Sequence, residues 1–97
     1  MSTSSNIVSL RIIVHGRVQG VGFRQFTLGK ARQHNIKGQV RNMADKTVEC
    51  IAQAEAQKID VFLNDLKKGP LFSRVDQIDT ETISTTPEQF IDFRIVS

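Results

Sequence analysis

The 97-residue chain has one cysteine, Cys50, and no tryptophan or tyrosine. One thiol cannot form an intrachain disulfide, and the absence of a CxxC pair or a Cys/His cluster argues against a structural zinc site. Cys50 alternates with Val48 and Ala52 in an apolar pattern, which predicts a buried, unreactive thiol. We therefore expect a domain that is stabilised by its own hydrophobic core and that needs no metal and no cofactor.

Long apolar runs are also missing. No run approaches the roughly 18 residues of a membrane span, and the first residues lack the basic and apolar regions of a signal peptide. The net charge of +3 at pH 7 suits an anionic ligand but is too small to indicate nucleic acid. We expect residues 1–6 to be a disordered polar tail and 7–97 to form a single domain. We expect a cytoplasmic monomer that binds neither membrane nor nucleic acid.

Apolar periodicity predicts both strands and helices. Alternation predicts strands over 8–14, 36–41, 48–54 and 91–95, and helical spacing predicts helices over 23–34 and 59–66. The pattern over 74–84 is weaker, because Val75 and Ile78 have opposite parity, so either a bulge lies between them or only one of them faces inward. The order βαββαβ predicts an α+β, ferredoxin-like two-layer sandwich, with a mainly antiparallel sheet and two helices on one face.

The segment Gly16–Arg24, GRVQGVGFR, lies between the first predicted strand and the first predicted helix. Glycine is costly to order, so the cluster indicates unusual dihedrals or a close approach of the backbone. Backbone N–H groups and a helix N-terminus together bind anions, and the Arg24 guanidinium matches phosphate oxygens. The alternative is a tight turn with an exposed arginine. We predict a phosphate-binding loop of Gln19, Gly20, Val21, Gly22, Phe23 and Arg24.

Two nucleotide-binding motifs are excluded. After Gly20-Val21-Gly22 the third glycine of a dinucleotide fingerprint is missing, and a single domain of this size has no room for that fold. A Walker A loop needs Ser or Thr after Gly-Lys, whereas Gly29-Lys30 is followed by alanine.

Asn42 ends the first strand of the predicted hairpin and shares parity with Val40, so its side chain should face the helices near the glycine loop. The alternative is that its amide only satisfies backbone groups at the turn. His15 and His34 are predicted to have structural roles, with a place at the mouth of the pocket as the alternative for His15. Arg17 either adds charge to the loop or faces solvent.

Segments Gly16–Arg24, Gly38–Asn42 and Asp45–Glu49 together resemble the two signature segments of the acylphosphatase family, and Gly69–Asp76 is similar to its GP-to-RVD segment. The resemblance implies a ferredoxin-like fold and hydrolysis of the carboxyl–phosphate bond of small acyl phosphates to carboxylate and inorganic phosphate. It also implies that Arg24 and the loop N–H groups bind the phosphate while Asn42 orients the attacking water. A carboxylate leaves without a proton, so no general acid is expected.

The chain departs from the family pattern at three places. Gln39 stands where many members have Trp, Lys46 replaces the common Gly of the hairpin turn, and Ile95–Ser97 lacks the usual Arg-Tyr type finish. None of these departures involves Arg24 or Asn42. Two alternatives to the enzyme stay open. A non-catalytic phosphate-binding or regulatory module would use the same loop, whereas an RNA-binding domain would need aromatics on central strands that carry none.

Overall fold

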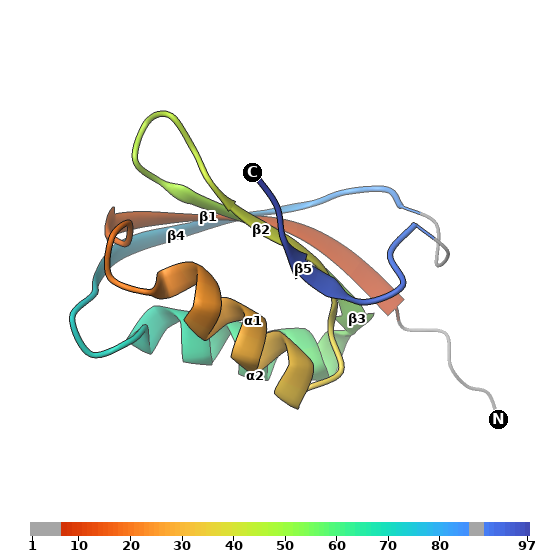
Figure 1. The fold of residues 1–97 in the computed structure, drawn as a ribbon. Helices are drawn as coiled ribbons and strands as arrows, with labels where there is room; N and C mark the ends of the chain where they lie inside the picture. Colours follow the sequence, from red (N-terminus) through yellow and green to blue (C-terminus); the bar gives the residue numbers. More distant parts are fainter. Residues whose placement is uncertain (1–6, 86–88) are drawn as a thin grey trace, which may run out of the picture.

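The computed structural model describes residues 7–85 and 89–97, so the expectation for the tail 1–6 lies outside the described residues (Figure 1). The elements are β1 (Ile7–Arg17), α1 (Phe23–Gln33), β2 (Lys37–Asn42), β3 (Val48–Glu55), α2 (Ala56–Lys68), β4 (Arg74–Thr82) and β5 (Phe93–Ile95). Neither helix of the described chain has the length and apolar character to span a membrane.

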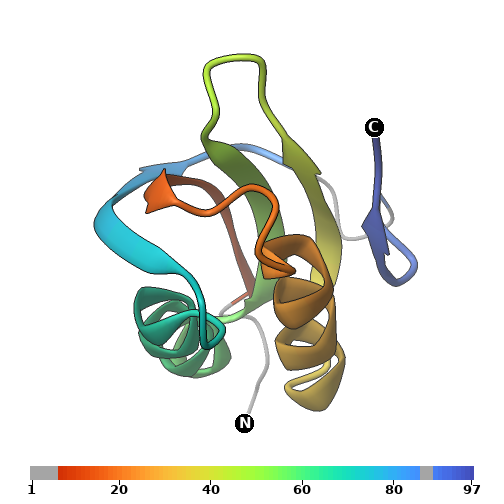
Figure 2. The same cartoon turned by 60° about the vertical axis from the view of Figure 1, so that its left-hand side comes forward.

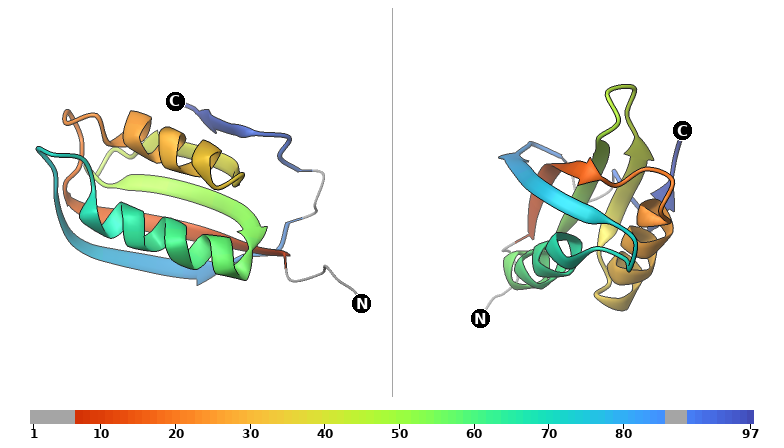
Figure 3. Two further views of the ribbon diagram at one scale, coloured as in Figure 1. Left: turned by 90° about the horizontal axis from the view of Figure 1, so that it is seen from below. Right: turned by 90° about the vertical axis from the view of Figure 1, so that its left-hand side faces the viewer.

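One five-stranded sheet has the order β4-β1-β3-β2-β5. The pairs among β1 to β4 are antiparallel, and β5 runs parallel to β2. Both helices lie on the same face of this sheet, as the rotated views show (Figures 2 and 3). The α+β, ferredoxin-like sandwich is therefore confirmed. The predicted order βαββαβ is one strand short, because two strands follow α2: the weakly patterned β4 is the fourth strand of the unit, and β5, predicted as its final strand, is an extra edge strand.

A one-residue bulge explains the weak pattern of β4. Gly16 of β1 pairs with Val75, and the preceding His15 pairs with Gln77, so Asp76 has no partner in the ladder. The extra residue restores parity, and both Val75 and Ile78 pack against the core. Of the two predicted explanations, the bulge is the one confirmed. The exposure of most other β4 side chains explains why the strand lacks a clear alternation.

The core lies between the helices and the covered face of the sheet. The helices contribute Phe23, Thr27 and Ala31 from α1 and Ile59, Phe62 and Leu66 from α2, all of them buried. Phe93 anchors β5, because its ring meets that of Phe62 nearly edge-on with centroids 6.2 Å apart. The prediction that Ile91 belongs to the final strand is wrong: β5 begins at Phe93, and Ile91 is 76% exposed.

The open face of the sheet is polar. The buried carboxylate of Glu49 accepts hydrogen bonds from Arg11 Nε at 2.6 Å and Arg41 Nε at 2.8 Å. Burial alone would raise the pKa of Glu49, but the hydrogen bonds and positive charges of Arg11 and Arg41 together outweigh it and hold that pKa below its usual range. Strands β1 to β4 carry no phenylalanine, tyrosine or tryptophan, and their one histidine, His15, is paired with Asp79, so this face lacks the stacking platform of an RNA-binding sheet.

Candidate active site

The glycine loop turns the chain sharply between β1 and α1. Gly20 and Gly22 have φ of 76° and 80°, and Gly22 is the N-cap residue of α1. The first bond of the helix runs from the Phe26 N–H to the Gly22 carbonyl, so the amides between them have no acceptor within the helix. The first turn holds no acidic residue and no side-chain cap. The partial positive charge of this helix end therefore stays available to an anion.

A pocket of about 230 Å³ lies where this loop faces the end of β2. It is lined by Gly20, Gly22, Phe23, Arg24 and Asn42, with Val18, Gln25 and Ile95 completing its wall. The fold thus brings the predicted phosphate-binding arginine and the predicted water-binding asparagine into one concavity.

Arg24 is an exposed arginine at the start of α1. Arg11, Arg41, Arg74 and Arg94 each pair with a carboxylate, whereas among residues 7–85 and 89–97 no carboxylate pairs with Arg24. Its planar guanidinium fork is therefore free to bind an oxyanion that enters the pocket.

Asn42 closes β2, where it pairs with Val48 across the hairpin. Its Oδ1 atom is buried and has no hydrogen-bond partner within the described part of the chain. Leaving such an acceptor unpaired costs about 1–3 kcal/mol, and the residue that carries it belongs to the pocket wall. The alternative is that the Asn42 amide satisfies backbone groups of the turn, but its oxygen accepts no hydrogen bond from a described backbone group.

Two residues of the predicted loop do not line the pocket. Val21 packs against the hydrophobic core, and the side chain of Gln19 points to the β2–β3 turn, where it binds the Met43 and Thr47 carbonyls. Sequence reasoning also missed Ile95, which reaches the wall because β5 pairs with β2 and sets Ile95 opposite Val40. No local pattern signals that contact.

The other reactive-looking side chains do not line this pocket. His15 pairs with Asp79 at 2.8 Å on the open face, and His34 joins α1 to α2 through Asp65 at 3.0 Å. Cys50 is buried, and that burial raises the pKa of its thiol far above the usual range, which keeps it unreactive. Their predicted structural roles agree with these contacts.

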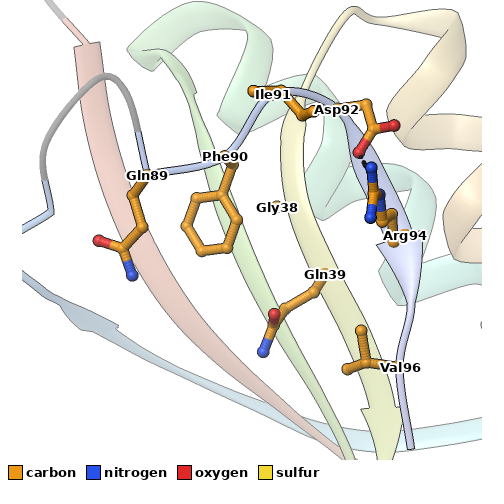
Figure 4. A pocket seen from close by; sticks show the side chains of 8 residues that line it. All are labelled: Gly38, Gln39, Gln89, Phe90, Ile91, Asp92, Arg94 and Val96. Carbon is orange, nitrogen blue, oxygen red and sulfur yellow. Dashed lines mark hydrogen bonds and ion pairs between the residues drawn. The ribbon is translucent and has the colours of Figure 1, made fainter.

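A larger hollow of about 500 Å³ lies beside β5 (Figure 4), and neither Arg24 nor Asn42 is among the described residues that line it. Gln39, Phe90 and Arg94 are among its lining residues, and the Arg94 guanidinium is engaged by Asp92 at 2.9 Å. It lacks both the glycine loop and an unpaired cation. Across the described residues no group of three or more His, Cys, Asp or Glu side chains is arranged to hold a metal ion.

The model of the family described as Acylphosphatase matches residues 10–95. The chain belongs to the acylphosphatase family. An acylphosphatase from Treponema denticola is 42% identical over 87 residues, which are 90% of each chain. The crystal structure of an acylphosphatase from Bacillus subtilis is 38% identical and superposes with a TM-score of 0.87, covering 93% of this chain and 99% of that one.

The same domain occurs within a longer protein. A probable carbamoyltransferase HypF from Methanocaldococcus jannaschii is 44% identical over 90 residues, which are 92% of this chain but 12% of that protein. The near-complete overlap with short acylphosphatases identifies the chain as an acylphosphatase hydrolase, an enzyme that acts on acyl phosphates and releases phosphate.

Proposed function

We propose that Arg24 and the backbone amides of the glycine loop bind the phosphoryl group of the acyl phosphate, and that Asn42 orients the attacking water. The observation that carries the proposal is the shared pocket, which joins an unpaired guanidinium, an uncapped helix N-terminus and the buried, unpaired Oδ1 of Asn42.

In the proposed reaction the water oxygen forms a bond to phosphorus as the bond from phosphorus to the carboxyl oxygen breaks. The carboxylate leaves with that electron pair and needs no proton, because it is a weak base. Asn42 Oδ1 accepts one hydrogen bond from the water and holds its oxygen in line. An amide is not a base, so the water proton passes to an oxygen of the phosphate itself.

Charge stabilisation comes from Arg24 and the loop. Phosphoryl transfer depends mainly on positioning and on stabilising charge at the equatorial oxygens. A guanidinium and several convergent N–H groups can do both, and removing one preorganised donor of this kind costs about 2.7–4 kcal/mol in the transition state.

The test is steady-state hydrolysis of an aromatic acyl phosphate in excess chelator, with inorganic phosphate as a competitor. Arg24→Ala should weaken phosphate binding and turnover together, whereas Asn42→Ala should keep phosphate binding and lose turnover by about a hundredfold or more. Arg32→Ala and Asn64→Ala, both at exposed helical positions outside the pocket, serve as matched controls and should behave as wild type.

Two results would change the assignment. Normal turnover by Asn42→Ala would remove the water-orienting role from this residue. Phosphate binding that depends on Arg24 without any hydrolysis by the wild-type protein would mean that the pocket binds phosphate but performs no chemistry.

A further inference from the structure

Gln19 makes a pair of contacts that the proposed chemistry does not use. Its Nε2 atom donates to the Met43 carbonyl and to the Thr47 carbonyl, both at 2.9 Å. Gln19 itself is half-buried and lies within the glycine loop, whereas its two acceptors close the β2–β3 turn. One side chain therefore ties the loop to the hairpin that carries Asn42.

The chemistry of the partners fixes the role of the amide. Both partners are carbonyl oxygens, which only accept, so the NH2 end of the amide must face them and use both of its hydrogens. Both carbonyls already accept backbone bonds: Met43 N–H donates to Thr47 at 2.9 Å, and Lys46 N–H donates to Met43 at 3.1 Å. Gln19 thus adds a second donor to each carbonyl at the base of the turn.

The two hydrogen bonds of Gln19 join the glycine loop to the end of β2, the two segments that face each other across the pocket. Met43 follows Asn42 directly, and Thr47 precedes Val48, the residue paired with Asn42 across the hairpin. On the other side, Gln19 precedes Gly20, which lines the pocket. We propose that Gln19 is a positioning residue, which holds Asn42 in line with the phosphorus bound in the glycine loop. This inference rests on the proposed function.

The expected consequence is a selective loss of rate. A misplacement of about 1 Å at a reacting group can cost about a hundredfold in rate. Phosphate binding should fall less than turnover, because Arg24 and the amides of the first turn are held by α1, whereas Gln19 holds only the loop residues that precede the helix. A residue that merely stabilised the fold would give no such separation between turnover and binding.

The experiment uses Gln19→Met, which keeps the length of the side chain and removes the donor, with Gln33→Met at an exposed position of α1 as the matched control. We expect kcat to fall at least about tenfold, while the inhibition constant of inorganic phosphate changes less than about twofold. All rates are measured at a temperature where each variant is fully folded by circular dichroism. If Gln19→Met does not fold, Gln19→Asn keeps the amide but is one methylene shorter, and the same expectations apply.

A double-mutant cycle with Asn42→Ala completes the test. If Gln19 acts through Asn42, adding Gln19→Met to Asn42→Ala should lower kcat by less than about twofold. Independent, multiplying losses, or a normal kcat for Gln19→Met, would overturn the inference. The proposed function fails separately, if Asn42→Ala alone retains turnover.

Discussion

Gly20 and Lys46 have the same backbone φ of 76°, in two turns that flank the candidate site. This conformation costs a residue with a side chain roughly 1–2 kcal/mol. The glycine loop uses Gly20 there and the β2–β3 turn uses a lysine, although the resemblance leads one to expect glycine in the turn as well. Gly20 lines the pocket, whereas Lys46 is exposed and outside it. The difference teaches that a positive φ alone does not require glycine. At Gly20 the pocket adds a second requirement, which is that a bound phosphate can approach the backbone closely.

Local hydrogen bonds help the turn to accept Lys46. The Asp45 carboxylate accepts from the Thr47 backbone N–H at 3.0 Å and from the Thr47 hydroxyl at 2.6 Å. Gln19 and the backbone bonds of Met43 hold the base of the same turn. The glycine loop has no such side-chain cap at the start of its helix. The backbone amides of the glycine loop therefore stay available to a ligand. The β2–β3 turn is not proposed to bind a ligand, so its backbone amides can be used within the turn.

The largest expected effect in this comparison is that of Gly20→Ala. A Cβ at Gly20 would meet no protein atom within 4 Å, so the loss of stability should come from φ alone and stay at about 1 kcal/mol. The methyl group stands at the pocket, where phosphate must approach the backbone closely, so turnover and phosphate affinity should both fall at least about tenfold. Phosphate inhibition and urea denaturation measure the two effects.

Gly29→Ala is the matched control for this substitution. Gly29 lies within α1, and an added Cβ there also meets nothing within 4 Å. Alanine should stabilise the helix by roughly 0.5–1 kcal/mol and leave turnover unchanged. If Gly20→Ala binds phosphate as tightly as Gly29→Ala does, glycine is not needed at the pocket. Gly20 and Lys46 would then differ only in the free-energy cost of a positive φ.

The opposite exchange, Lys46→Gly, should change stability but not turnover, and its effect should be smaller than that of Gly20→Ala on phosphate binding and turnover. Removing the side chain from a residue with φ of 76° should stabilise the protein by about 1 kcal/mol, which raises the Tm of a domain of this size by roughly 4–8 °C. Turnover should not change, because Lys46 is outside the pocket. Thermal unfolding followed by circular dichroism measures the shift. An unchanged or lower Tm would mean that other contacts of the lysine side chain outweigh the backbone cost.

The sequence predicts what depends on short patterns and misses what depends on the pairing of distant segments. Period-two alternation places Asn42 on the helix-covered face, and the spacing of glycines marks the loop, so both halves of the pocket are predictable. The contact of Ile95 with the pocket needs β5 to pair with β2, and the contacts of Gln19 need the loop to meet the hairpin turn. Neither follows from periodicity, because both depend on three-dimensional packing.

The smallest effect on stability should come from removing the Asp45 carboxylate, which supports the turn that contains Lys46. Hydrogen bonds from the hydroxyl and the backbone N–H of Thr47 hold the pKa of Asp45 below its usual range. Because the pKa of Asp45 is lower in the folded protein than in the unfolded chain, its stabilisation is complete above the pKa of the unfolded state, about 4. The stabilisation is lost as the pH falls through the pKa of the folded state.

Urea denaturation from pH 7 down to about pH 2.5 tests this contribution. Asp45→Ala should be less stable than wild type at pH 7, and the difference should shrink as the pH falls below about 4. Thr47→Val removes the hydroxyl donor, which makes the largest contribution to the lowered pKa, and should weaken the same pH dependence. If Asp45→Ala costs as much at the lowest pH as at pH 7, the carboxylate charge does not support the turn, and the backbone bonds of Met43 are left to offset the conformation of Lys46.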